Sequence, residues 1–141
     1  MTTRRFSREV AFQFLFSELP AEGQLGAVTK PIDFLQSNFE SFCKNFEYST
    51  DDYAWELVRE VGKNLPSLDS LVKNLSTNWR IERMPRVDLT ILRMCAHEIT
   101  SRQDIPRNVS IFEAVELAKR FGAEDSPAFV NGLLDKIQRK E

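Results

Sequence analysis

The sequence predicts an all-α protein of about seven helices in two small packed bundles. Apolar residues recur at helical spacing along nearly all of the 141 residues, and no segment alternates with the period of two that strands show. Five glycines and six prolines are too few for a turn-rich all-β protein. A chain of this length can bury one sizeable core, so we expect a single domain over residues 1–141, with sub-bundles of about 1–78 and 79–141.

Apolar faces separated by helix-breaking residues predict the first four helices. The first runs over about residues 4–19 and ends at the Pro20–Gly23 turn. The second begins at Pro31, the third follows Thr50 as a cap, and the fourth begins after a break at Pro66–Ser67. The residues expected to face inward are, in order, Phe6, Val10, Ala11, Phe14 and Leu15; Phe34, Leu35, Phe39, Phe42, Cys43 and Phe46; Tyr53, Leu57, Val58, Val61 and Leu65; and Leu68, Leu71, Val72, Leu75 and Trp79.

The last three helices are predicted in the same way. Pro85 starts the fifth, the DIPRNVS segment (104–110) is a loop, and the sixth begins at about Ser110 and ends before Gly122. Ser126–Pro127 opens the seventh as N-cap and first helical residue. The residues expected to face inward are Leu89, Leu92, Cys95, Ala96 and Ile99; Ile111, Ala114, Val115, Leu117 and Ala118; and Phe129, Val130, Leu133, Leu134 and Ile137.

The seventh helix contains Asn131 and Gly132, a dipeptide that normally marks a turn. Glycine inside a helix costs about 1 kcal/mol relative to alanine. A helix tolerates this cost where another backbone must come close. We therefore expect Gly132 to let this helix pack tightly on the first or fifth helix, and Asn131 to hydrogen-bond a backbone end inside the bundle.

The net charge is −2, but the charges are spread unevenly. Residues 1–17 have an excess of two positive charges, residues 18–69 carry ten acidic and four basic residues, and residues 70–141 carry twelve basic and ten acidic ones. This asymmetry fits a surface for a polyanion near the N-terminus and the second half. It also fits an ordinary mixed surface, and charge alone does not decide between them.

The sequence lacks the patterns of metal, catalytic and membrane sites. Cys43 and Cys95 lie in apolar helical segments, which is typical of buried reduced thiols in a cytosolic protein. His97 is the only histidine, so we expect no metal and place its imidazole at the surface or in a hydrogen bond. Cys95, His97 and Glu98 do not face one another on a helix as a proton relay requires. No apolar run is long enough to span a membrane or to form a signal peptide, and no glycine-rich phosphate loop predicts a cofactor.

Two features near the start of the seventh helix have two interpretations each. The FGAED segment precedes Ser126, and a helix N-terminus offers free N–H groups to a phosphate or a base edge. Simple capping by Ser126 explains the same residues. Phe129 belongs either to the core or to a surface where it stacks on an unpaired base, a contact worth about 1–3 kcal/mol.

Four segments, in order along the chain, resemble the NusB family. They are Arg4–Phe16 (RRFSREVAFQFLF), Val87–Ile99 (VDLTILRMCAHEI), Ile111–Gly122 (IFEAVELAKRFG) and Glu124–Lys136 (EDSPAFVNGLLDK). Between about residues 18 and 75 the likeness rests on helical pattern and length. The resemblance implies a cytoplasmic, non-enzymatic, RNA-binding transcription antitermination factor. It also implies that the protein pairs with NusE, a small-subunit ribosomal protein, and binds single-stranded boxA RNA of ribosomal operons within the antitermination complex of RNA polymerase. Relatives include monomers and homodimers.

The resemblance also implies roles for single residues. The residues that would contact RNA are Arg4, Arg5 and Arg8 through phosphates, and Asp125, Ser126 and Phe129 on the same surface. Phe16 and Asp88 match positions that face NusE. If the RNA contacts are right, the starts of the first and last helices form one electropositive surface.

Four residues depart from the family pattern: Phe6 where arginine is common, Ala128 where lysine can occur, Phe112 in place of asparagine, and His97 in place of tyrosine. The first two lower the expected RNA affinity and its salt dependence. Phe112 is either a core change or an exposed hydrophobe on a partner surface. These departures favour one alternative, a helical protein–protein adaptor with weak or lost RNA binding. The resemblance implies a second alternative, the RNA-guiding part of an RNA methyltransferase, because a NusB-like domain precedes some ribosomal RNA cytosine methyltransferases.

Overall fold

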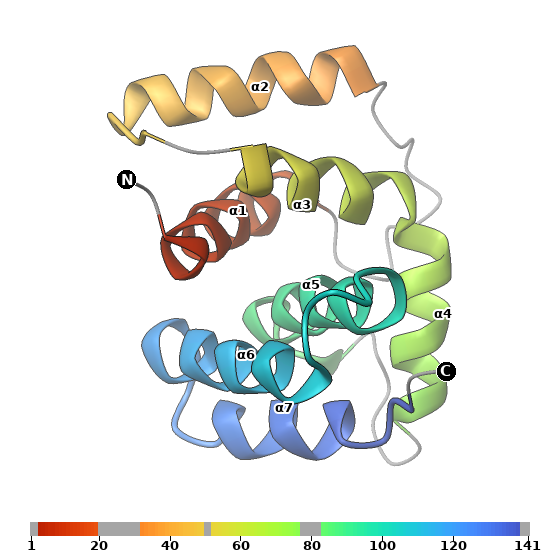
Figure 1. Ribbon diagram of the computed structural model, residues 1–141. Coiled ribbons are helices and arrows are strands. Elements are labelled where there is room, and N and C mark those ends of the chain that lie inside the picture. Colours follow the sequence, from red (N-terminus) through yellow and green to blue (C-terminus); the bar gives the residue numbers. More distant parts are fainter. Residues whose placement is uncertain (1–2, 20–31, 50–51, 77–82, 139–141) are drawn as a thin grey trace.

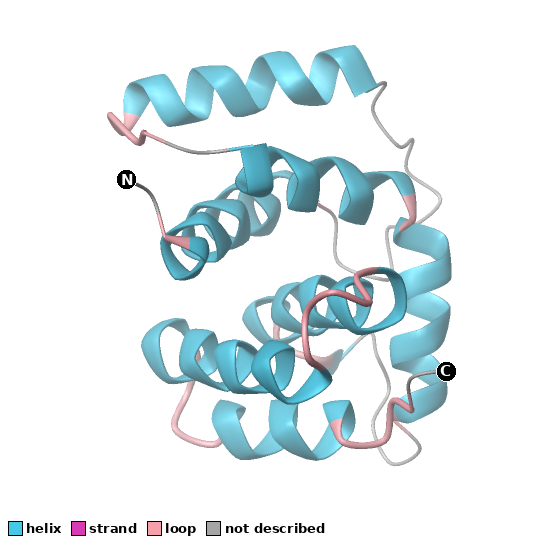
Figure 2. Ribbon diagram, viewed as in Figure 1, coloured by secondary structure: helices cyan, strands magenta, loops and turns pink. Residues whose placement is uncertain are grey.

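The computed structural model describes residues 3–19, 32–49, 52–76 and 83–138. Seven helices and no strand occur in these residues, so the all-α prediction is confirmed (Figures 1 and 2). The helices are α1 (Arg4–Glu18), α2 (Ile32–Asn45), α3 (Asp52–Lys63), α4 (Leu65–Leu75), α5 (Arg86–Ser101), α6 (Arg107–Phe121) and α7 (Ser126–Leu134).

The helices form two groups, and α5 contacts helices of both. Figure 1 shows α1, α2 and α3 on one side and α5, α6 and α7 on the other. Every residue from Asp88 to Ile99 in α5 is buried, because α1, α3, α4, α6 and α7 all pack on this helix. Helix α4 contacts α3, α5 and α7, and so links the two groups. The division of the chain at about residue 78 stays a prediction, because residues 77–82 lie outside the described part.

Phenylalanines join the helices of the core. The Phe14 ring of α1 lies edge-on to Phe39 of α2, with ring centres 5.1 Å apart. On another side of α1, Phe12 stacks on Phe121 of α6 at 4.8 Å. Helix α1 therefore contacts both groups of helices and fixes how α6 lies beside it. Both cysteines, Cys43 and Cys95, are buried and free, as predicted.

Two of the residues predicted to face inward on the second helix are exposed. Phe34 and Phe46 are 53% and 58% exposed. Phe46 lies beyond the end of α2 and stacks on Tyr48, with ring centres 5.7 Å apart. Helix α2 packs on α1 and α3 along one narrow face, so apolar spacing alone overestimated how much of it is buried. Trp79, predicted at the end of the fourth helix, lies outside the described residues.

Two helix boundaries differ from the prediction. Leu65 opens α4 instead of closing the third helix, and Pro66 stands in the first turn of α4. Helix α6 begins at Arg107, so the second half of the predicted 104–110 loop is helical. In both places the prediction treats a proline as a break. A helix tolerates proline at its N-cap, as Pro106 of α6, or in its first turn, as Pro66 of α4, because an N–H there has no intrahelical partner. Thr50, the predicted cap of the third helix, lies outside the described residues.

The prediction that Gly132 packs tightly against a neighbour is wrong. A Cβ atom added at Gly132 would meet no atom within 4 Å, and both Gly132 and Asn131 are exposed. The opposite face of α7 carries its buried residues, so this glycine lies toward solvent. The close approach occurs at Gly122 instead, where a Cβ atom would lie 2.7 Å from the Ser126 side chain and 2.8 Å from the carbonyl oxygen of Ala118. Gly122 has a φ of −96°, so its requirement is space and not a left-handed backbone.

Candidate nucleic-acid interface

The three arginines predicted to contact RNA lie in the first two turns of α1. Thr3 caps this helix, because its hydroxyl oxygen accepts a hydrogen bond from the Phe6 N–H at 3.1 Å. At 100° per residue, Arg4 and Arg8 point toward α3 and α5, whereas Arg5 points toward α6. Arg4 is exposed, and its guanidinium carbon lies 4.5 Å from the centre of the Tyr53 ring.

Arg8 is buried and ion-paired. Its Nε and Nη2 atoms donate to the two carboxylate oxygens of Glu98 at 2.8 and 3.2 Å. The hydroxyls of Tyr53 and Ser110 also donate to Glu98. Burial lowers the pKa of Arg8, but the hydrogen bond and charge of Glu98 outweigh this effect and raise it above its usual value. Burial and the Glu98 charge raise the pKa of Tyr53, so its hydroxyl stays protonated and keeps donating. Arg8 therefore anchors α1 to α5, and its guanidinium is not available at the surface.

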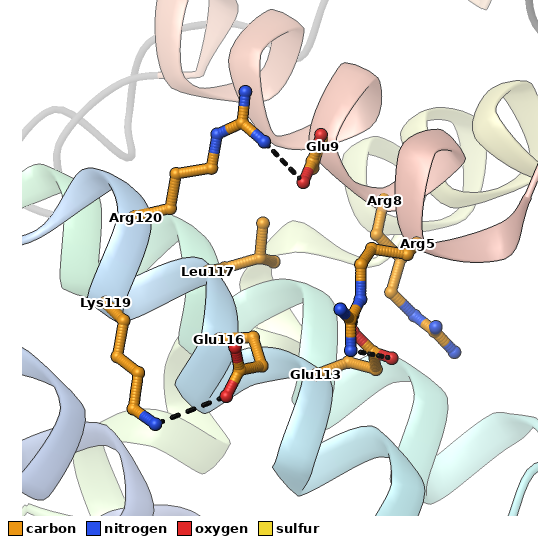
Figure 3. A pocket seen from close by; sticks show the side chains of 8 residues that line it. All are labelled: Arg5, Arg8, Glu9, Glu113, Glu116, Leu117, Lys119 and Arg120. Carbon is orange, nitrogen blue, oxygen red and sulfur yellow. Dashed lines mark hydrogen bonds and ion pairs between the residues drawn. The ribbon is translucent and has the colours of Figure 1, made fainter.

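Arg5 reaches the opposite helix and lines a pocket between α1 and α6 (Figure 3). Its Nε and Nη2 atoms donate to Glu113 at 3.0 and 3.2 Å. Arg120 of α6 reaches back to Glu9 of α1 at 2.9 Å. The pocket has a volume of about 340 Å³ and is lined by Arg5, Arg8, Glu9, Glu113, Glu116, Leu117, Lys119 and Arg120. We call the charged residues of this lining other than the buried Arg8, namely Arg5, Glu9, Glu113, Glu116, Lys119 and Arg120, the α1–α6 seam.

The cations of the α1–α6 seam lie outside its carboxylates. The side chains of Arg5 and Arg120 are 53% and 61% exposed, whereas their partners Glu113 and Glu9 are only 15% and 14% exposed. Lys119 is 60% exposed and lies 3.3 Å from Glu116 on the same helix. The hydrogen bond and charge of Glu113 raise the pKa of Arg5, with smaller effects from Glu116 and Glu9. The seam thus presents guanidinium and ammonium groups to solvent.

The start of α7 is built differently from the prediction. Asp125 and not Ser126 occupies the N-cap position, and its side chain makes no capping hydrogen bond. Ser126 is buried, and its hydroxyl accepts a hydrogen bond from the Ala123 N–H at 3.0 Å and bonds to the Asp88 carboxyl. Ser126 therefore holds the start of α7 to the start of α5. Asp125 is exposed, and Phe129 is half-buried against the core.

Of the two residues predicted to face NusE, Phe16 lies near the end of α1 and Asp88 lies in the first turn of α5. Arg86 donates to the carbonyl oxygen of Phe16 at 2.6 Å, and its guanidinium lies 4.8 Å from the centre of the half-buried Phe16 ring. Asp88 is buried behind Ser126, and its Oδ1 atom makes no hydrogen bond with the described residues. Burial raises the pKa of Asp88, and the Ser126 hydrogen bond opposes that rise. Phe16 is therefore accessible in part, whereas the Asp88 carboxylate is not.

The prediction that the starts of α1 and α7 form one electropositive surface stays a prediction. The start of α7 bonds to the start of α5, which Arg86 ties to the end of α1. Arg5 and Phe16 are separated by roughly 16 Å along α1 at 1.5 Å per residue. Lys119 and Arg120 lie between these two places, and sequence reasoning missed them as site residues. Lys119 and Arg120 follow Glu116 by three and four residues, and α1 carries Arg5 and Glu9. These charges on the two helices are the signal that could have predicted the seam.

Three of the departures from the family pattern lie at the surface or near it. Phe6 packs edge-on against Tyr48 at 5.6 Å, so it makes an apolar contact where a charge was expected. Phe112 is 54% exposed, and the Arg5 guanidinium carbon lies 6.0 Å from its ring centre. Phe112 is thus an exposed hydrophobe and not a core change. Ala128 is exposed.

Of the two predicted settings of His97, at the surface or in a hydrogen bond, the structure excludes the surface. His97 is buried, and its Nε2 atom makes no hydrogen bond with the described residues. Burial lowers its pKa, which favours the neutral imidazole. In the part of the chain that the structure describes, no three His, Cys, Asp or Glu side chains form a group that could hold a metal ion, and no helix is long and apolar enough to cross a membrane.

Comparisons with known proteins show the family of this chain. Residues 5–139 match the NusB family. The transcription antitermination protein NusB of Geotalea daltonii is 44% identical over 143 residues, which covers 97% of this chain and 94% of that protein. NusB of Geobacter sulfurreducens is 43% identical, with the same coverage.

Two solved structures share the fold. NusB from T. maritima matches with a TM-score of 0.70 and 32% identity over 96% of this chain and 89% of that one. A crystal structure of the antitermination factors NusB and NusE in complex with double-stranded RNA matches with a TM-score of 0.71 over 94% of this chain and 92% of that one, and its 21% identity bears on the fold alone. With the family match over nearly all residues and relatives above 40% identity, this chain belongs to the NusB family.

Proposed function

We propose that this chain is a non-enzymatic, RNA-binding transcription antitermination factor that acts with NusE on boxA RNA of ribosomal operons. The observation that carries the proposal is the α1–α6 seam, with Arg5, Lys119 and Arg120 exposed beside the exposed Arg4. Relatives that span nearly the whole chain are antitermination proteins, and one solved structure with this fold holds NusE and RNA. This role places the protein in the cytoplasm with RNA polymerase.

The proposed RNA path follows the seam from the start of α1 to the start of α7. Arg4 and Arg5 contact phosphates at one end, and Lys119 and Arg120 contact phosphates in the middle. Such contacts position a nucleic acid without reading its sequence. At the other end the half-buried Phe129 offers part of its ring to an unpaired base, and the exposed Asp125 carboxylate accepts hydrogen bonds from base amino groups. Arg8 and Ser126 support this surface from within.

NusE contacts the far end of α1 in this proposal. The half-buried Phe16 ring, covered on one side by Arg86, supplies an aromatic contact of the kind enriched at protein interfaces. Asp88 acts indirectly, because it holds Ser126 and through it the start of α7. The NusE surface and the Phe129 end of the RNA path are therefore neighbours, so one RNA strand can touch both proteins.

Paired substitutions test the proposed path. In the Arg4→Ala/Arg5→Ala and Lys119→Ala/Arg120→Ala variants, we expect weaker binding of boxA RNA and of unrelated single strands alike. The slope of log K against log salt should fall by about 0.7 for each lost phosphate contact. Phe129→Ala should lower the affinity with little change in slope, because stacking is not a charge effect. The measurement is fluorescence anisotropy over a salt series, with and without NusE.

The matched control removes two cations far from the seam. Lys44 on α2 and Lys73 on α4 are exposed, so Lys44→Ala/Lys73→Ala makes the same change in net charge. Equal effects of the control and the seam variants would refute the proposed RNA path. Arg8 is left unchanged in every variant because it is buried.

A protein adaptor with weak RNA binding is the second candidate function. Exposed Phe112 lies in a groove of about 390 Å³ between α6 and α7, and apolar surface of this kind favours a protein partner. A complex with NusE that forms without RNA, together with RNA affinity that does not respond to the seam variants, would favour the adaptor.

A further inference from the structure

Every exposed cation of the α1–α6 seam is already paired with a carboxylate. Arg5 pairs with Glu113 and Arg120 pairs with Glu9, each across the two helices, whereas Lys119 pairs with Glu116 within α6. Three positive and three negative side chains therefore cancel along the proposed phosphate path, as Figure 3 shows. A surface that binds a polyanion would be expected to keep excess positive charge. The seam has no such excess of positive charge.

A gain in folding stability does not explain the ion pairs of the seam. Exposed ion pairs contribute little to folding because water and salt screen them. The stacking of Phe12 on Phe121 and the buried Arg8–Glu98 pair hold α1 to its neighbours next to the same seam. These contacts remain when a seam carboxylate is neutralised.

The geometry of the Arg5 pair matches that of a bound phosphate. Arg5 donates through Nε and Nη2 to both oxygens of Glu113, and this fork is the arrangement with which guanidinium also grips phosphate. A phosphate must therefore displace Glu113, or share Arg5 with a negative charge that is hydrogen-bonded to it. Either way the carboxylate weakens phosphate binding. The same holds at Arg120, whose Nη1 atom donates to Glu9.

We propose that Glu113 and Glu9 compete with RNA phosphates for Arg5 and Arg120, and that this competition sets the affinity of the protein for RNA. The inference rests on the proposed function and names residues that weaken RNA binding. RNA binding then begins at Lys119, whose flexible side chain leaves Glu116 easily, and proceeds by exchange of the two crossed pairs. Strands that offer phosphates to both arginines at once displace both carboxylates, whereas short or poorly placed strands do not.

Neutralising the carboxylates tests the competition. Glu113→Gln and Glu9→Gln keep side-chain shape and remove the charge. Each should tighten RNA binding roughly two- to fivefold at low salt, the range that an exposed ion pair allows. Each should also steepen the salt slope by up to about 0.7, because a released arginine neutralises a further phosphate. The double variant should show both gains, with a melting temperature close to that of the unchanged protein.

Two comparisons make the result specific. Glu40→Gln makes the same change in net charge at an exposed residue of α2, away from the seam. It should leave the affinity for RNA nearly unchanged. In a double-mutant cycle, Glu113→Gln should tighten binding much less when Arg5 is already alanine, because the released group is then absent.

The outcomes separate this inference from the proposed function. Equal or weaker RNA binding by Glu113→Gln and Glu9→Gln would overturn the inference alone, since weaker binding would mean that the carboxylates orient the arginines for RNA. A gain matched by Glu40→Gln would also overturn it, because the effect would then be one of net charge. Absence of RNA binding by the unchanged protein and all variants, with NusE present, would overturn both proposals.

Discussion

Glu98 is the most heavily hydrogen-bonded side chain of the buried interior described above. It accepts from Arg8, Tyr53 and Ser110, which come from α1, α3 and α6. A buried carboxylate needs such partners, because removing one leaves a charge without compensation in a poorly polar interior. Arg8 is therefore a structural residue whose neighbours in sequence, Arg4 and Arg5, are the exposed ones.

Replacement of Arg8 tests this assignment. Arg8→Ala should lower the free energy of unfolding by about 3–5 kcal/mol, because it leaves Glu98 buried without its main cationic partner. Arg4→Ala loses an exposed cation–π contact with Tyr53 and should cost about 0.5–1 kcal/mol. Urea unfolding measures both. An Arg8→Ala variant as stable as Arg4→Ala would contradict the anchoring role.

His97 makes stability depend on pH near neutrality. Burial lowers its pKa below the value of 6.5 that it has in the unfolded chain, so the unfolded state binds the proton more readily. This contribution to stability is present at pH 7.5 and is lost as the pH falls below about 6.5. The free energy of unfolding, measured in urea, should therefore fall more between about pH 7 and 5.5 in the unchanged protein than in His97→Phe.

The difference in the free energy of unfolding between the unchanged protein and His97→Phe reports the contribution of His97. Asp88 acts in the opposite direction, since burial raises its pKa and its unfavourable charge is relieved as the pH falls. Asp88 is present in both proteins, so its effect cancels in the comparison. Parallel curves of stability against pH would show that the His97 imidazole is not responsible.

Gly122, the C-cap residue of α6, and Gly132 within α7 have opposite expected effects on stability when replaced by alanine. Gly132→Ala should stabilise the protein by up to about 1 kcal/mol, because an exposed helical position gains propensity without a clash. Gly122→Ala should destabilise it, because the new Cβ would meet Ser126 and the Ala118 carbonyl at under 3.0 Å. Thermal unfolding of the two variants tests the expected direction of each change in stability. A destabilising Gly132→Ala would indicate a contact on that face of α7 in solution.

Sequence patterns predicted the helices better than their ends and their buried faces. Stripes of apolar residues are local, and all seven described helices follow from them. The starts of α4 and α6 were placed too late, because a proline both breaks a helix and opens one. Phe34 and Phe46 were assigned to the core, because spacing does not show how wide a face the neighbouring helices cover.

Across the whole molecule, the candidate site could be predicted only in part. Arg4 and Arg5 follow from the motif at the start of the chain, and both are exposed. The burial of Arg8 depends on Glu98, and that of Ser126 depends on Asp88. The α1–α6 seam likewise joins segments more than a hundred residues apart. Such pairings come from tertiary packing, which local patterns do not encode.

The ion pair of Arg8 and Glu98 joins residues that are far apart in the sequence, and this affects the order of folding during synthesis. Its partner Glu98 lies 90 residues further along the chain, and the partner of Arg5 lies 108 residues further. At about 5–20 residues per second, a ribosome delivers Glu98 several seconds after Arg8. Helix α1 thus emerges first but reaches its final place only when the last third of the chain exists. The α1–α6 seam is therefore complete only after Arg120, the partner of Glu9, has been synthesised.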